Sequence, residues 1–116
     1  MKTLRERRLF RDSGRALVVA MDHSRAFDTI TGLKDPNTII GEVIGAGADA
    51  ILVPYGTAVG SAEVIGNGGL WLSVDPTPQT VGSLVESAIR LGADGIKAEV
   101  YPWCEREDEY FGSYTG

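Results

Sequence analysis

Short apolar runs alternate along the chain with longer segments in which apolar residues recur at helical spacing. The first run covers residues 16–22, where six consecutive apolar residues precede Asp22. An apolar run of this length with polar ends predicts a strand that is buried on both faces, as in a parallel sheet. Similar runs predict three further strands, over residues 50–55, 70–75 and 96–101.

The segments between these runs predict helices. Asp35 is suited to cap a helix that starts at Pro36 and ends near Gly45, because a proline favours the first helical position. The apolar residues of this helix form one stripe at helical spacing. We expect other helices over residues 3–11, over 58–65 and up to Leu91. In the first of these we expect Leu4 and Phe10 to pack inward and the arginines to form a solvated face.

The order β-α-β-α-β-α-β predicts an α/β fold, a (β/α) parallel sheet with right-handed crossovers. Two joints between a helix and a strand repeat the letters Gly-Ala-Asp, at residues 47–49 and 92–94. This echo is consistent with a repeated βα unit, although ordinary loop chemistry alone would also produce it. We expect a single domain over residues 1–116, with an atypical tail at 105–116.

Side chains alternate between the two faces of a strand, so the predicted strands have one apolar and one polar face. Buried charges are costly unless they find partners, and a barrel interior or crevice would bring them together. In α/β folds the carboxyl ends of parallel strands line the ligand site. The polar face carries Asp22, Ser73, Asp75, Lys97 and Glu99.

Each candidate residue has a chemical and a structural interpretation. Asp22 could act as a general acid or base or bind a substrate hydroxyl, or it could cap the strand end. His23 could transfer protons at its usual pKa, or it could be a loop histidine with local hydrogen bonds. Lys97 could form a Schiff base, but Glu99 on the same face favours a charged lysine in an ion pair. Asp75 could line the substrate site or cap the next helix.

Composition and charge limit the partners, the cellular location and the cofactors that we expect. The formal net charge of −5 argues against nucleic acid as the main partner. Neither a signal peptide nor a membrane span is expected, and Cys104 has no second cysteine to pair with, which suggests a cytoplasmic protein. One histidine without clustered ligands argues against a zinc site, and we expect no metal or cofactor. The glycine-rich stretch at 66–69 precedes a strand, so we interpret it as a turn.

Three segments carry a resemblance to a known family: Ala-Met-Asp-His-Ser at 20–24, Gly-Leu-Lys-Asp-Pro at 32–36 and Gly-Ala-Asp-Ala-Ile-Leu-Val-Pro-Tyr-Gly at 47–56. In order and spacing they resemble the first half of the class I fructose-bisphosphate aldolases of the archaeal and bacterial DhnA type, also described as DeoC/LacD-like aldolases. The resemblance runs from about Arg8 to Trp103.

This resemblance implies a partial TIM barrel covering about strands one to four. It also implies a carbon–carbon lyase that acts through a Schiff base on a phosphorylated sugar or ketone, with Asp22 at the substrate. The family's Schiff-base lysine, its tyrosine and its phosphate site belong to later strands, so we expect the isolated half to be inactive. The alternative is a non-catalytic interaction module. Unpaired sheet edges predict a homo-oligomer in either case.

Overall fold

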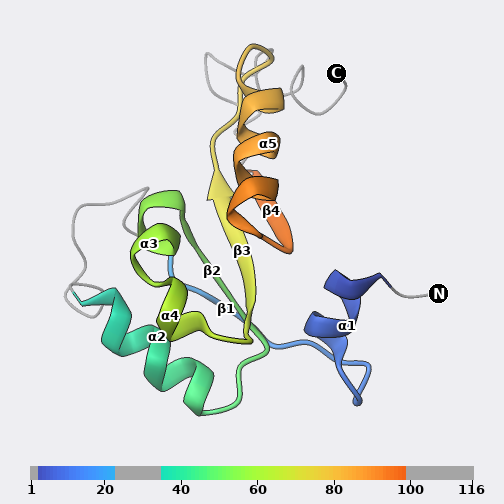
Figure 1. Cartoon of the computed structure of the whole chain (residues 1–116), viewed down its shortest axis with the longest axis vertical. Helices are drawn as coiled ribbons and strands as arrows, with labels where there is room; N and C mark the ends of the chain where they lie inside the picture. Colours follow the sequence, from blue (N-terminus) through green and yellow to red (C-terminus); the bar gives the residue numbers. More distant parts are fainter. Residues whose placement is uncertain (1–2, 23–34, 99–116) are drawn as a thin grey trace, which may run out of the picture.

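The computed structural model describes residues 3–22 and 35–98, and its centre is one parallel sheet with the strand order β1-β2-β3-β4 (Figure 1). This arrangement confirms the α/β fold and is consistent with a partial TIM barrel. In the described part of the chain, no helix has the length and apolar character needed to cross a membrane. The strands are β1 (Val18–Ala20), β2 (Ala50–Pro54), β3 (Gly69–Val74) and β4 (Gly95–Ala98).

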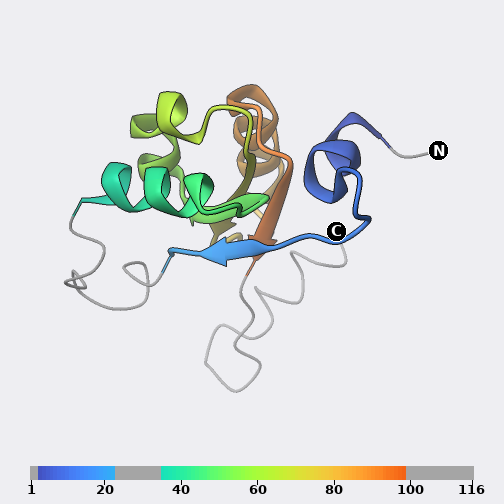
Figure 2. The ribbon, with the colours of Figure 1, turned by 90° about the horizontal axis from the view of Figure 1, so that it is seen from below.

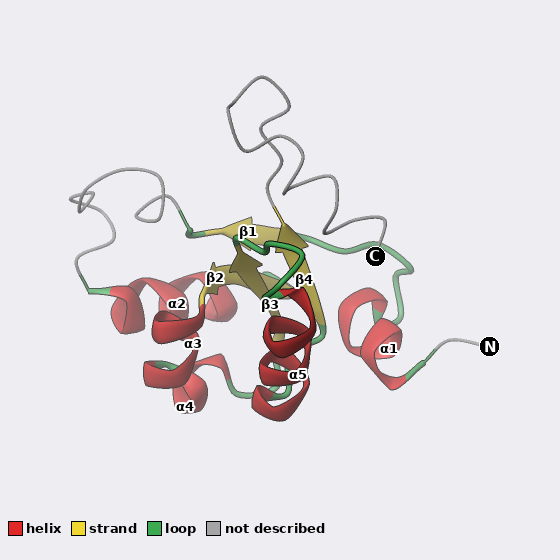
Figure 3. Ribbon diagram, turned by 90° about the horizontal axis from the view of Figure 1, so that it is seen from above, coloured by secondary structure: helices red, strands yellow, loops and turns green. Residues whose placement is uncertain are grey.

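Four helices gather on one side of the sheet, whereas the first helix lies apart from them (Figures 2 and 3). Asp35 caps α2 as the sequence predicts, because its carboxylate accepts hydrogen bonds from the backbone N–H and, at 2.6 Å, from the hydroxyl of Thr38. Pro36 occupies the first turn. The four helices are α2 (Pro36–Gly45), α3 (Tyr55–Gly60), α4 (Ala62–Ile65) and α5 (Val81–Leu91).

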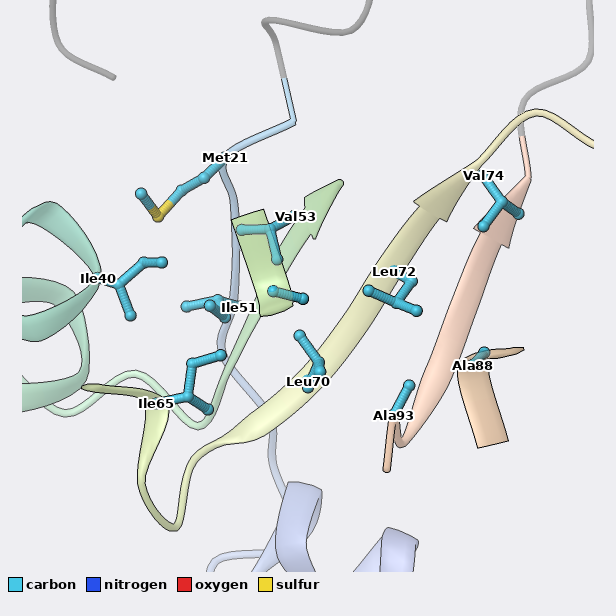
Figure 4. Close-up of a cluster of buried hydrophobic side chains, with 11 residues drawn as sticks. Met21, Ile40, Ile51, Val53, Ile65, Leu70, Leu72, Val74, Ala88 and Ala93 are labelled. Atoms are coloured by element: carbon cyan, nitrogen blue, oxygen red, sulfur yellow. The ribbon is translucent and has the colours of Figure 1, made fainter. Parts of the chain in front are cut away.

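The core lies between these helices and the apolar face of the sheet. Ile40 of α2 and Ile51 of β2 are completely buried, and Ala88 of α5 packs into the same cluster. Figure 4 shows Leu70 and Leu72 of β3 beside them. Alternate residues of each strand point into this core, as the sequence predicts, so the residues between them lie on the other face of the sheet.

Two predicted elements differ from the structure. The first strand has only three residues, and the backbone of the preceding Leu17 is bonded to the backbone and side chain of Asp49 as well as to Ala50. The helix expected over 58–65 is two short helices. The chain leaves helical geometry at Ser61, whose buried hydroxyl forms a 2.5 Å hydrogen bond to the Asn37 side chain.

The repeated Gly-Ala-Asp joints perform the same task twice. Asp49 Oδ2 accepts the backbone N–H of Leu17 at 2.7 Å, and the Asp49 N–H donates to the Leu17 carbonyl. Asp94 makes the equivalent pair of bonds to Leu70, at 2.9 and 2.7 Å. The glycine that begins each joint, Gly47 or Gly92, has a positive φ that a side chain would disfavour. Each aspartate therefore fixes the start of the neighbouring strand.

Helix α1 (Leu4–Phe10) contacts these same aspartates. Arg8 pairs with Asp94 at 2.9 Å, and Arg11 lies 3.9 Å from Asp49. The arginines are exposed, as the sequence predicts, and these two also form ion pairs. Leu4, expected to pack inward, is 74% exposed, and the half-buried residues of α1 are at its C-terminal end. The helix is attached at the end of the sheet where the strands begin.

Candidate functional site

Three polar side chains meet at the opposite end, where the strands finish. Ser73 of β3 and Lys97 of β4 are direct partners in the ladder and point to the same face. Asp22 lies two residues beyond Ala20 and therefore reaches the same level from β1. The Lys97 Nζ is 2.8 Å from the Asp22 Oδ2, and the Ser73 hydroxyl also bonds to the Asp22 carboxylate.

The contact between β1 and β4 shows that the sheet is curved. Adjacent strands lie about 4.8 Å apart, so a flat sheet would separate β1 from β4 by about 14 Å. Side chains stand roughly perpendicular to the sheet, so Asp22 and Lys97 of a flat sheet would not meet. Their ion pair requires a sheet that is concave on the face away from the core. This is the geometry of a barrel interior.

The environment of Asp22 favours its ionised form. Burial opposes ionisation, because the residue is only 7% exposed. The hydrogen bonds from Lys97 and Ser73 and the charge of Lys97 outweigh that effect, so the pKa of Asp22 lies below its ordinary value. Lys97 is more accessible, with 39% of its side chain exposed. Asp22 is thus buried, whereas Lys97 is accessible from the side of the sheet that faces away from the core.

This arrangement can bind and move protons at the carboxyl end of a parallel sheet. An ionised carboxylate can accept a proton from a substrate hydroxyl, and an accessible ammonium can bind a substrate oxygen. A lysine next to a carboxylate is held in its charged form and is a poor nucleophile. Among the described residues, no three His, Cys, Asp or Glu side chains gather in a cluster.

The structure brings Asp22 and Lys97 together in an ion pair. The ion pair of Lys97 with Glu99 that the sequence suggests stays a prediction. His23 and Glu99 lie outside the described residues. Asp75 is exposed just after β3 and does not cap α5, whose N-cap is Thr80. Its role at the substrate stays a prediction.

Ser73 is the site residue whose role sequence reasoning did not identify. Alternation places it on the polar face, but a serine in an apolar strand gives no separate signal of function. Its 3% exposure and its bond to Asp22 become apparent only in the folded chain. Tyr55 directly follows β2 and is 49% exposed. It therefore stands at the rim of the same end of the sheet.

Comparison with known proteins shows a likeness to a curated enzyme. The chain is 34% identical, over 93% of its length, to the 2-amino-3,7-dideoxy-D-threo-hept-6-ulosonate synthase of Halobacterium salinarum. It spans 43% of the length of that synthase, slightly less than half. No protein-family model matches the chain, and no solved structure matches it significantly.

Proposed function

We propose that this chain carries the N-terminal part of an aldolase-type carbon–carbon lyase site. The observation that carries the proposal is the meeting of Asp22, Ser73 and Lys97 at the carboxyl end of a curved parallel sheet. The likeness to a synthase of a keto acid supports the same class of chemistry. The substrate class that we propose is a small carbonyl compound, either a phosphorylated sugar or ketone or a keto acid.

Each residue of the cluster has a proposed role. In aldol cleavage a base removes the proton of the hydroxyl group β to the carbonyl, and that oxygen forms a new C=O group as the carbon–carbon bond breaks. The bonding electron pair forms the enolate of the other fragment, with its charge on the original carbonyl oxygen. Asp22 is ionised and can accept that proton. Ser73 holds the carboxylate, and Lys97 binds a substrate oxygen as an ammonium ion. His23, Asp75 and Glu99 remain proposed contributors to proton transfer and substrate binding.

Lys97 is not the proposed imine-forming group. Imine formation needs a neutral amine, and the Asp22 carboxylate at 2.8 Å favours the charged form. We therefore propose that the 116-residue chain binds its carbonyl ligand without appreciable aldolase activity. The test is borohydride reduction with dihydroxyacetone phosphate, followed by mass spectrometry of the intact protein. A stoichiometric adduct that disappears in Lys97→Met would overturn this assignment and make the chain a minimal aldolase.

Ligand binding tests the proposal directly. Calorimetry would use two probes, dihydroxyacetone phosphate and 2-amino-3,7-dideoxy-D-threo-hept-6-ulosonate, which separate phosphorylated from carboxylated carbonyl compounds. We expect one of them to bind, and Asp22→Asn and Lys97→Met each to weaken binding by about tenfold or more, because each removes a charge-assisted contact. Arg90→Met, which breaks an exposed ion pair on α5, is the control. If both probes fail to bind, or if the control weakens binding equally, the site assignment is wrong.

A further inference from the structure

The free edge of β1 presents unpaired backbone groups. Met21 donates its N–H to Leu52 of β2, and Leu17 accepts from Ala50 of that strand. The N–H and C=O groups of successive residues point to opposite sides of a strand, so the intervening residues of β1 face away from β2. In the described part of the chain, no strand pairs with β1 on that side.

The side chains along this edge do not protect it. Leu17 is 58% exposed and Val18 is 38% exposed, and Ala20 is exposed as well. Isolated edge strands are commonly protected by lysine, proline or an inward-pointing charge. From Leu17 to Ala20 the chain has none of these. An apolar edge strand with backbone N–H and C=O groups available for pairing is suited to bind a further strand.

The opposite edge of the sheet, at β4, also carries exposed apolar groups. Val85 and Ile89 lie one turn apart on α5 and are 37% and 58% exposed. With Ile96 of β4 they line a cavity of about 160 Å³ that is open to solvent. Within residues 3–22 and 35–98, β4 pairs with β3 alone, and no described strand lies on its outer side.

We propose that a second copy of this chain closes the sheet, with β4 of each copy lying parallel to β1 of the other. The two edges of one parallel sheet are complementary, so a two-fold axis along the barrel would satisfy both at once. The Asp22–Lys97 pair already imposes the curvature that closure needs. In this assembly both Asp22–Ser73–Lys97 clusters open at the same end.

Hydrogen exchange at the Ala20 amide tests the proposal without any mutation. In a single copy this N–H faces solvent and exchanges quickly, whereas in the closed assembly it donates to the second copy. We expect sedimentation velocity to show a dimer at micromolar to millimolar concentration, and the exchange of the Ala20 amide to slow as the dimer forms. A monomer throughout that range, or a dimer in which this amide still exchanges freely, would overturn the proposal.

Two substitutions at one position locate the interface. Ala20→Pro removes an N–H that β2 does not use, and proline is tolerated at such edge positions. We expect it to raise the dissociation constant of the dimer about tenfold or more, since each of the two equivalent interfaces loses a hydrogen bond. Ala20→Ser keeps the N–H and should leave the dimer unchanged. Equal dimerisation of both variants would show that β1 is not the contact, and the exchange measurement decides the matter if the proline variant does not fold.

Discussion

Replacing Lys97 with methionine tests how the site is held together. Methionine keeps much of the volume of the lysine stem but removes the ammonium that contacts Asp22 at 2.8 Å. Asp22 would keep its bond to Ser73 and would remain buried, with 7% of its surface exposed. A buried carboxylate that loses its charged partner is costly, so we expect Lys97→Met to lower the free energy of unfolding at neutral pH.

The burial of the two partners sets the magnitude of this loss. Breaking a fully buried ion pair costs about 3–5 kcal/mol, whereas exposed pairs contribute about 0–1 kcal/mol. Asp22 belongs to the first class, but the Lys97 side chain is 39% exposed and water screens part of its charge. An intermediate loss of about 2 kcal/mol is therefore expected, and Ser73 keeps it from being larger.

The loss of stability in Lys97→Met is expected to depend on pH. The pKa of Asp22 in the folded protein lies below its ordinary value of about 3.9. The group therefore contributes stability that is present above the unfolded pKa and is lost as the pH falls through the lower folded pKa. Without Lys97 the pKa of Asp22 rises, because burial remains while its strongest partner is gone. The difference between wild type and variant should consequently be largest near pH 7 and shrink as the pH falls below about 4.

Urea unfolding followed by circular dichroism at several pH values would measure this difference. Arg90→Met is the matched control, because Arg90 and Glu86 form a pair of similar length, 2.7 Å, with both side chains largely exposed. Its effect should stay below about 0.5 kcal/mol at every pH. If Lys97→Met costs no more than the control, or if its cost is independent of pH, the Asp22–Lys97 pair does not carry the stability that its burial implies.

Three further substitutions probe the scaffold, each measured by urea unfolding. Gly95→Ala would place a methyl group 2.8 Å from the Trp71 ring, so we expect a loss of about 1–3 kcal/mol; no loss would mean that the ring moves freely. Ile40→Ala empties a completely buried position and should cost about 2–5 kcal/mol; a loss below 1 kcal/mol would place Ile40 outside the core. Asp94→Ala removes the acceptor of the Leu70 N–H and should cost about 1–3 kcal/mol; an unchanged midpoint would mean that this bond is dispensable.

The elements with local signals were predictable from the sequence. Asp35-Pro36 marks the start of α2 because both residues act within one turn, through a side-chain acceptor and a fixed φ. The alternation of apolar and polar residues correctly placed Asp22 and Lys97 on the same face of the sheet. The short helices after β2 were less predictable, because the break at Ser61 depends on a hydrogen bond to the distant Asn37.

The pairing of charges could not be read from sequence spacing. Lys97 pairs with Asp22, 75 positions away in the chain, because sheet curvature brings β1 and β4 together. The same limit applies to Arg8, whose charge looked solvated in a short amphipathic segment and is bound to Asp94. Sequence periodicity gives the face on which a side chain lies, whereas the curvature of a sheet depends on all of its strands at once.

The two ends of the sheet use buried aspartates for different purposes. Asp94 accepts a backbone N–H of Leu70 and pairs with Arg8, so its contacts serve the register of a strand and the attachment of a helix. The principal partners of Asp22 are instead the side chains of Ser73 and Lys97, and none of them fixes a strand end. Stability alone gives little reason to bury a carboxylate in this way, since an apolar group of similar size would often serve as well. This pair at the carboxyl ends of the strands, partly open on the lysine side, is therefore consistent with the ligand site that we propose there.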